Sequence, residues 1–235
     1  MCRRLAKRGI LALSIVVAMT CCAAAALAKT ERGTPGRDKL VGTKRADKLF
    51  GRAGRDKLLG RRGSDRLKGG KGRDKLFASR GNDVLVGGPA ADLLKAGKGN
   101  DDLRGGPAGD VLKAGDGSDV LLGGPANDVM KGGPGDDDLT GGPGSNTLNG
   151  GPGDDLLIQG PDGGTMIGGP GHDQFNELDG VPIGGDGNDV IDARDGEEEE
   201  INCGDGNDVA IVDASEEGVI DCETVSEPTA RGERR

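Results

Sequence analysis

The sequence predicts an all-β protein: a parallel β-roll, or β-solenoid, of about sixteen nine-residue repeats with a small C-terminal capping segment. Three observations lead to this fold class. An aspartate recurs every nine residues through positions 33–176, a large apolar residue follows it two places later, and glycines gather at the first, second and fourth places of the repeat. Such a strict period is typical of stacked repeat proteins and not of ordinary globular domains.

The sixth place of the repeat holds an aspartate in fourteen of the sixteen repeats. These aspartates are Asp38, Asp47, Asp56, Asp65, Asp74, Asp83, Asp92, Asp101, Asp110, Asp119, Asp128, Asp137, Asp155 and Asp173. Asn146 and Gly164 stand at the two remaining sixth places. The eighth place is always Leu, Met or Phe, from Leu40 to Phe175, so the phase is unbroken over all sixteen repeats.

The first six places of the repeat predict a turn, because glycine adopts positive φ and lets backbones pack closely. The last three places, around the apolar residue, predict a short strand. One inward residue per strand cannot bury itself alone. Two repeats make an 18-residue coil, however, and stacked coils bury a continuous apolar column. Sixteen repeats therefore predict a rod of eight coils.

The full pattern G-G-x-G-x-D-x-U-x, in which U is a large apolar residue, occurs at residues 69–77, 132–140, 150–158 and 168–176. It resembles the calcium-binding nonapeptide repeat of RTX, or haemolysin-type, proteins. The resemblance implies that sixth-place carboxylates and backbone carbonyls of the turns hold Ca²⁺ between stacked turns, a set of hard oxygen ligands that suits this ion. The aspartates implied as ligands are Asp74, Asp83, Asp92, Asp101, Asp110, Asp119, Asp128, Asp137, Asp155 and Asp173. In the family manner these turns would hold about ten ions at most.

The first four repeats, residues 33–68, depart from this pattern at the second place. The residues that replace glycine there are Thr34, Thr43, Arg52 and Arg61. Residues 29–80 carry 18 basic and 6 acidic side chains, net +12, whereas residues 81–230 carry 6 basic and 33 acidic side chains, net −27. We therefore expect calcium mainly at residues 69–176 and regard residues 29–68 as a basic N-terminal part of the roll.

Residues 18 apart lie above one another in a roll, so Lys39, Lys57 and Lys75 are expected to form one row. A row of arginines is expected beside the aspartates; its members are Arg37, Arg55 and Arg73. Two hypotheses remain open. Either the guanidinium groups bridge aspartates where calcium is missing and the lysines are only solvated, or the lysine row binds a polyanion such as a cell-wall polymer or an acidic polysaccharide. Nucleic acid is an unfavourable partner, because no aromatic residues alternate with these charges.

Residues 1–28 have the order of a secretory signal peptide. Four basic residues precede an apolar run at positions 10–26, and an Ala-Leu-Ala ending predicts cleavage before Lys29. A retained membrane anchor and, from Cys21 and Cys22, a lipoprotein are the alternatives. Cleavage predicts a secreted chain with no membrane span and lowers the formal charge from −9 to −13, because four basic and no acidic residues leave.

Cys203 and Cys222 would remain after cleavage. An even pair in an exported protein predicts a disulfide between them, worth about 3 kcal/mol in the loop-entropy model. Two free thiols, or half of a metal site, are the alternatives. The pair lies in residues 177–226, where the nine-residue phase is lost and which we expect to cap the open end of the roll. Residues 227–235 are expected to be a disordered tail.

The sequence contains no G-x-S-x-G elbow, no H-E-x-x-H and no P-loop lysine motif, three motifs of enzymatic chemistry. His172, the single histidine, stands at a variable turn position, and we expect it to be exposed with no catalytic role. The sequence thus predicts a secreted, non-enzymatic protein that folds on binding several calcium ions and has a structural or adhesive role. A polyanion- or cell-wall-binding module that uses the basic coils is the alternative.

Overall fold

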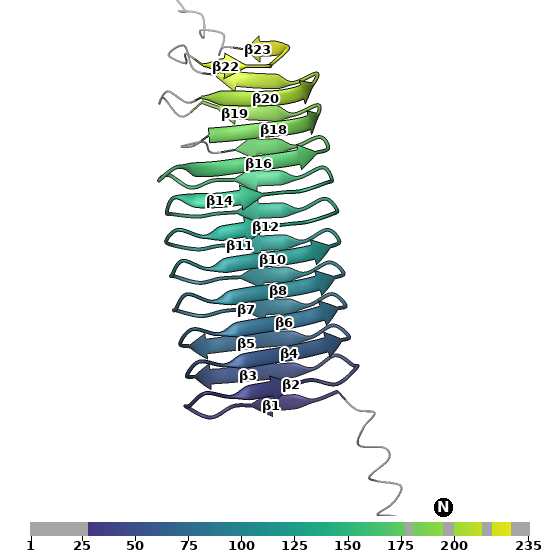
Figure 1. Cartoon of the computed structure of the whole chain (residues 1–235), viewed down its shortest axis with the longest axis vertical. Coiled ribbons are helices and arrows are strands. Elements are labelled where there is room, and N and C mark those ends of the chain that lie inside the picture. Colours follow the sequence, from purple (N-terminus) through teal and green to yellow (C-terminus); the bar gives the residue numbers. More distant parts are fainter. Residues whose placement is uncertain (1–27, 177–180, 195–199, 213–217, 227–235) are drawn as a thin grey trace, which may run out of the picture.

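Parallel strands wind the chain into one stack of coils (Figure 1). This computed structural model describes residues 28–176, 181–194, 200–212 and 218–226. Its 23 strands form two parallel sheets, one of 12 strands and one of 11. Consecutive strands alternate between the sheets, so each coil contributes one strand to each sheet. No helix occurs among the described residues.

The 12-stranded sheet contains the odd-numbered strands β1 (Thr30–Arg32), β3 (Lys48–Ala53), β5 (Arg66–Lys71), β7 (Val84–Val86), β9 (Asp102–Arg104), β11 (Val120–Leu122), β13 (Asp138–Thr140), β15 (Leu156–Ile158), β17 (Gln174–Asn176), β19 (Val190–Ala193), β21 (Val209–Val212) and β23 (Thr224–Ser226). The 11-stranded sheet contains the even-numbered strands β2 (Lys39–Val41), β4 (Lys57–Arg62), β6 (Lys75–Arg80), β8 (Leu93–Lys98), β10 (Val111–Asp116), β12 (Val129–Lys131), β14 (Asn146–Asn149), β16 (Gly164–Pro170), β18 (Val181–Gly187), β20 (Ile201–Gly206) and β22 (Val219–Ile220).

The register repeats every 18 residues through the nonapeptide region. Leu49 pairs with Leu67 in one sheet, and Leu58 pairs with Leu76 in the other. The predicted all-β parallel β-roll is therefore confirmed. The stack is longer than the eight coils that sixteen repeats predict, because strands continue beyond the last in-phase repeat as far as β23.

A column of apolar side chains fills the middle of the stack. All sixteen eighth-place residues from Leu40 to Phe175 are buried, and all except Leu40 are at most 1% exposed. Each buried side chain of this size contributes roughly 1.5–3 kcal/mol before its loss of conformational entropy is subtracted. Ile191 in β19 and Ala210 in β21 continue the column into the C-terminal coils.

Glycine at the second place is required both by backbone conformation and by stacking. Gly88 has a φ of 144°, and a Cβ there would overlap the carbonyl oxygen of Gly70 in the preceding coil. The basic N-terminal coils keep this conformation without glycine, since Arg52 and Arg61 have φ of 87° and 90°. Those positive values are unfavourable for a residue with a side chain, so these two turns are strained.

The described strands after residue 180 continue the roll with a changed offset. Val181 lies opposite Thr165, an offset of 16 residues, and Val209 lies opposite Val190, an offset of 19. Both pairings are parallel and belong to the same two sheets. The segment that the sequence assigns to a cap therefore extends the stack, and its last strands β22 and β23 form the outermost coil (Figure 1).

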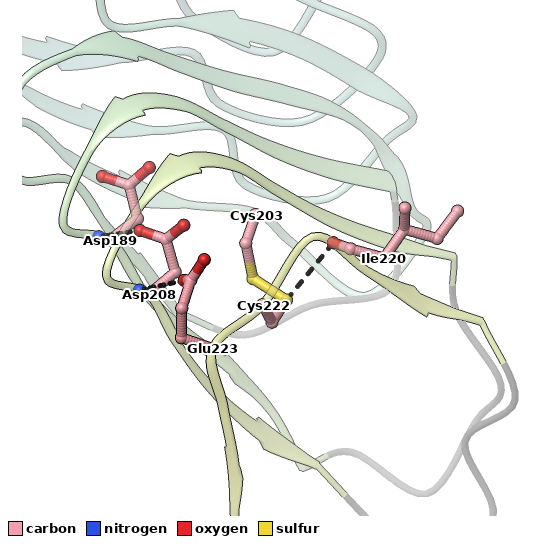
Figure 2. The surroundings of a disulfide bond; sticks show 6 residues. All are labelled: Asp189, Cys203, Asp208, Ile220, Cys222 and Glu223. Atoms are coloured by element: carbon pink, nitrogen blue, oxygen red, sulfur yellow. Dashed lines mark hydrogen bonds between the residues drawn. A yellow bond between two sulfur atoms is a disulfide. The ribbon is translucent and has the colours of Figure 1, made fainter.

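A disulfide joins the last two coils (Figure 2). Cys203 in β20 is bonded to Cys222, which lies between β22 and β23, with the two Cα atoms 5.2 Å apart. The predicted pairing is confirmed, and the alternatives of two free thiols or half of a metal site are excluded. Because Cys203 is fully buried, the bond ties the last coil to the core.

Both predicted terminal segments lie largely outside the described residues. The predicted signal peptide overlaps them only at residue 28, and the predicted tail, residues 227–235, does not overlap them. In the part of the chain that the structure describes, no helix has the length and apolar character needed to cross a membrane.

Candidate metal centre

Two columns of carboxylates follow the turns of the stack, each at the residue before a strand. The first, which we call the long column, precedes strands of the 12-stranded sheet. It consists of Asp47, Asp65, Asp83, Asp101, Asp119, Asp137, Asp155, Asp173, Asp189 and Asp208, and ends at Glu223. The second, the short column, precedes strands of the 11-stranded sheet. It consists of Asp38, Asp56, Asp74, Asp92, Asp110 and Asp128, and ends at Asn146.

One carboxylate oxygen of each aspartate joins neighbouring coils. The backbone N–H of Asp101 donates to Oδ1 of Asp119 at 2.7 Å, and that of Asp119 donates to Oδ1 of Asp137 at 2.8 Å. In the short column, the N–H of Asp74 donates to Oδ1 of Asp92 at 2.6 Å. The nine-residue spacing therefore stacks the carboxylates directly above one another.

The second oxygen, Oδ2, is buried and has no hydrogen-bond partner in fourteen aspartates of the described residues. These are Asp56, Asp65, Asp74, Asp83, Asp92, Asp101, Asp110, Asp119, Asp128, Asp137, Asp155, Asp173, Asp189 and Asp208. Oδ2 of Asp92 lies 2.5 Å from the point that a Cβ on Gly87 would occupy, and the Gly105 carbonyl oxygen lies 2.8 Å from the same point. The first-place glycine thus leaves room for a cluster of oxygen atoms.

Burial raises the pKa of Asp155 to about 8 and those of Asp92, Asp101 and Asp137 to about 7. Desolvation is the largest cause, and carboxylates in adjacent coils add to it. The backbone N–H that each of these carboxylates accepts acts in the opposite direction. A raised pKa means that the charged form is held at a free-energy cost. A cation at the bare oxygens would stabilise that charged form.

The donor atoms fit calcium. No group of three or more His, Cys, Asp or Glu side chains gathers as a metal site among the described residues. The oxygens that the columns offer are the bare Oδ2 atoms and nearby backbone carbonyls. Ca²⁺ takes six to eight hard oxygens with flexible geometry and commonly uses backbone carbonyls. Structural Zn²⁺ sites are instead built from the nitrogen of His and the sulfur of Cys, which the columns do not offer.

All ten aspartates that the resemblance implied as ligands lie in the two columns, buried and with a bare Oδ2. The same geometry extends to four aspartates outside that set: Asp56, Asp65, Asp189 and Asp208. The sequence carried a signal for the last two. Residues 184–192 form a complete G-G-x-G-x-D-x-U-x motif, and residues 203–211 repeat it with Cys203 at the first place and the small Ala210 at the eighth. A fixed nine-residue phase passes over both, because they are shifted from it.

The first aspartate of each column is satisfied by a threonine at the second place. Oδ2 of Asp38 accepts the backbone N–H of Thr34 at 2.6 Å and its hydroxyl at 3.0 Å. Oδ2 of Asp47 likewise accepts the backbone N–H of Thr43 at 2.5 Å and its hydroxyl at 3.1 Å. Protein donors therefore satisfy in these two turns the oxygen that is bare in the turns that follow.

Arginine bridges to the column aspartates, one hypothesis for the basic coils, do not occur in the part of the chain that the structure describes. The ion pairs of the described residues include none between an arginine and a column aspartate. Arg52 instead donates to the Gly33 carbonyl oxygen at 3.5 Å, and Arg32 stacks on Phe50 at 5.5 Å from the ring centre. The hydroxyl and backbone groups of Thr34 and Thr43 take the role that the hypothesis gave to guanidinium groups.

The lysine row is formed as predicted by the register. Lys39 pairs with Lys57 and Lys57 with Lys75, and all three side chains are exposed on the 11-stranded sheet. The row stops at Leu93, the next residue in register. A second basic surface lies on the 12-stranded sheet, where a groove of about 470 Å³ is lined by Arg32, Phe50, Arg52, Lys68, Gly69 and Gly70.

His172 is exposed at the turn beside Asp173. Its Nδ1 accepts the backbone N–H of Asn188 at 3.0 Å, and its own backbone N–H donates to Oδ1 of Asp154 at 2.9 Å. These bonds join the exposed turn of His172 to the turn of Asp154 in one neighbouring coil and to the turn of Asn188, 16 residues further on, in the other.

Stacked parallel coils with two columns of buried carboxylates, each backed by carbonyl oxygens, define a calcium-binding repeat protein of the β-roll class. The chain belongs to the family of the RTX calcium-binding nonapeptide repeat, whose four-copy model matches residues 32–67, 60–94, 95–130, 104–139, 131–158 and 183–197, together more than half of the chain. The last match includes Asp189, in the motif that lies out of phase. No curated protein matches the chain.

Proposed function

We propose that this chain is a secreted, non-catalytic rod with a structural or adhesive role, whose β-roll folds when it binds calcium outside the cell. The row of bare Oδ2 atoms supports this proposal. Each buried polar group without a partner costs roughly 1–3 kcal/mol, and fourteen of them would together exceed the roughly 5–15 kcal/mol of net stability that a folded domain retains. Leucine stacking must therefore be assisted by a ligand that satisfies these oxygens.

Coupling of binding to folding follows from where the ligands are. In an extended chain the column carboxylates are solvated and far apart, so no site exists until the turns stack. The binding free energy of calcium then becomes folding free energy. At low intracellular calcium the acidic chain would stay extended, and at millimolar external calcium it would close coil upon coil.

Secretion is supported by two features. Residues 1–28 have the order of a secretory signal, and the disulfide between Cys203 and Cys222 is of the kind that persists in oxidising compartments. A non-catalytic role is supported by the use of the buried carboxylates: each accepts a backbone N–H and faces carbonyl oxygens, which suits a structural ion better than proton transfer.

A calcium titration of the chain from residue 29 tests this function. Isothermal calorimetry counts the ions, and far-ultraviolet circular dichroism on the same samples follows the strands. We expect a cooperative coil-to-β transition near millimolar calcium and its reversal by excess EDTA. A spectrum that is fully β in EDTA and unchanged by calcium would refute calcium-driven folding.

The second candidate function is binding of a polyanion, such as a cell-wall polymer or an acidic polysaccharide, by the basic coils. The observation in its favour is the register of Lys39, Lys57 and Lys75, which brings three ammonium groups into one exposed row. The repulsion among stacked like charges lowers stability, and an anionic polymer lying along the row would remove it.

Salt-dependent retention on an immobilised polyuronate tests this candidate. Replacing Lys39, Lys57 and Lys75 by Gln should abolish retention. A matched control exists on the same sheet, where Lys95, Lys113 and Lys131 form another row in register within the acidic part of the roll. If the control triple reduces retention as strongly as the test triple, the basic coils are not the binding surface.

A further inference from the structure

The short column is interrupted at a turn that has every feature of a calcium turn except the acid. Residues 141–146 read GGPGSN, so the glycines of the first, second and fourth places are all present. Asn146 keeps the bond that joins the coils, since its Oδ1 accepts the backbone N–H of Asp128 at 2.9 Å. The substitution therefore leaves the path of the chain unchanged and alters only the second atom of the side-chain head group.

That second atom is a hydrogen-bond donor. Nδ2 of Asn146 donates to the carbonyl oxygens of Gly142 and Gly144, each at 2.8 Å. It lies 2.6 Å from the point that a Cβ on Gly141 would occupy, which is where Oδ2 lies in the other turns. Only a donor satisfies two carbonyl oxygens, so the amide nitrogen, and not the amide oxygen, must face them. An amide group thus engages oxygens that a cation would otherwise need.

The next turn on the same side also lacks a carboxylate at the sixth place, where Gly164 stands. Gln159, which is 1% exposed, extends its side chain into this space. Its Nε2 donates to the carbonyl oxygens of Asn146 and Gly163, whereas its Oε1 is buried and has no hydrogen-bond partner. Two uncharged amides therefore fill consecutive turns of the short column.

The long column shows no such interruption. After Asp155 it continues through Asp173, Asp189 and Asp208, each with a bare Oδ2. It closes at Glu223, whose Oε2 accepts the backbone N–H of Asp208 at 2.8 Å (Figure 2). Among the described residues beyond Asn146, the buried aspartates all belong to the long column.

We propose that the amide of Asn146 replaces a calcium ion, so that the run of ions along the short column stops at Asp128 and the turns of Asn146 and Gly164 hold none. This inference rests on the proposed calcium-binding function and adds the place where one column stops. The rod is then asymmetric: from Asp56 to Asp128 calcium neutralises carboxylates at both edges of the coils, whereas at the turns of Asn146 and Gly164 only the opposite edge, formed by the long column, holds ions. Asn146 and Gln159 act as positioning residues that keep these two turns closed at any calcium concentration.

The test is the substitution Asn146→Asp in the secreted chain, with calcium content measured by atomic emission after equilibration in saturating calcium and by calorimetric titration. Asp at this position exchanges the donor for a bare oxygen beside the Gly142 and Gly144 carbonyls, so we expect about one additional ion per chain. The variant should also need more calcium to fold, because it adds a buried charge to the calcium-free state. The control is Asn149→Asp, which adds the same charge three residues away in β14 and outside the column, and should add no ion.

Each outcome is decisive. Wild-type chain that binds no calcium refutes the proposed function and this inference with it. Wild-type chain that binds calcium, with an unchanged ion count in Asn146→Asp, refutes the inference alone. Should Asn146→Asp fail to fold, Asn146→Ala decides the matter: we expect an unchanged ion count and a lower melting temperature, whereas the loss of one ion would show that Asn146 is itself a ligand.

Discussion

The backbone N–H of Asp137 donates to Oδ1 of Asp155 at 2.8 Å, while Oδ2 of Asp155 is buried and has no partner in the described part of the roll. One oxygen of the carboxylate thus belongs to the backbone ladder, and the other faces the space where metal ligands gather. The two tasks are separable. A residue that keeps the first oxygen and changes the second should preserve the fold and alter only its dependence on calcium.

Replacing Asp119 and Asp137 by Asn separates the two roles, because it keeps Oδ1 for the bond between coils and removes Oδ2 as a metal ligand. Asn146 shows that an amide keeps the bond between coils while its nitrogen satisfies carbonyl oxygens of the turn. We expect about two fewer ions per chain and a calcium midpoint for folding that is lower than in the wild type, because two buried charges are removed. Calorimetry and circular dichroism measure both quantities.

The matched control replaces two exposed acids of the same coils, Asp116 and Asp138, by Asn. It removes the same two negative charges as the column variant, but from the surface, and should leave the number of bound ions unchanged. If the control lowers the ion count as much as the column variant does, the columns are not the binding sites.

The stability of the calcium-free roll should depend on pH with a defined sign. Burial raises the pKa of Asp155 to about 8 and that of Asp137 to about 7 in the folded state, against about 4 in an unfolded chain. Between these values the folded state binds more protons, so its stability falls as pH rises from about 4 to about 8. In EDTA, circular dichroism should show more β-structure at pH 5 than at pH 8.

Calcium should reverse this dependence, because the ion displaces the protons that the columns hold. Calcium affinity should therefore rise as pH increases through about 6 to 8, the range of the raised pKa values. Calorimetry in two buffers of different ionisation enthalpy would detect the released protons. Affinity that is independent of pH across this range would mean that the carboxylates are already ionised before calcium binds.

The fold was predictable from the sequence because the positions of glycine, aspartate and leucine in each repeat determine where the turn and the strand lie. Leu139 two residues after Asp137 is enough to place one side chain in the core and one in the turn, and the period stacks the coils. The continuation of the roll beyond residue 180 was not predicted, because stacked residues there are 16 and then 19 apart. The motif at residues 184–192 is complete, but a fixed phase does not reach it.

The site was predictable in outline and not in detail. The spacing of the repeat identifies the carboxylates but does not show which of their two oxygens accepts a hydrogen bond. That Nδ2 of Asn146 is a donor where the aspartates have the acceptor Oδ2 is therefore visible only in the contacts of the structure. Similarly, arginine bridges to the aspartates were one of two open hypotheses for the basic coils, whereas in the structure Thr34 and Thr43 are the partners of Asp38 and Asp47. For the hydrogen-bond partner of a turn aspartate, a charged group on a long side chain is a weaker predictor than a neighbouring backbone N–H.

Removal of the disulfide by Cys203→Ser together with Cys222→Ser should loosen the last coil. The loop-entropy model assigns about 3 kcal/mol to a crosslink of this span, and the bond is the covalent link between β20 and the outermost coil (Figure 2). Hydrogen exchange should become faster in β22 and β23 while β10 and β12 remain protected. Equal loss of protection along the whole stack would indicate that the roll unfolds as one unit from this end.

Gly88→Ala should destabilise the roll although it adds only a methyl group. Ala126 already tolerates a φ of 90° at the fourth place, so positive φ alone is not prohibitive. At Gly88 the new Cβ would in addition overlap the Gly70 carbonyl oxygen of the preceding coil. We expect a loss of roughly 1–3 kcal/mol or more, measured by urea denaturation in saturating calcium. Gly36→Ala is the control, because its Cβ would meet only the Thr34 hydroxyl at 3.7 Å; equal effects of the two substitutions would show that the contact between stacked turns does not limit which residues the second place accepts.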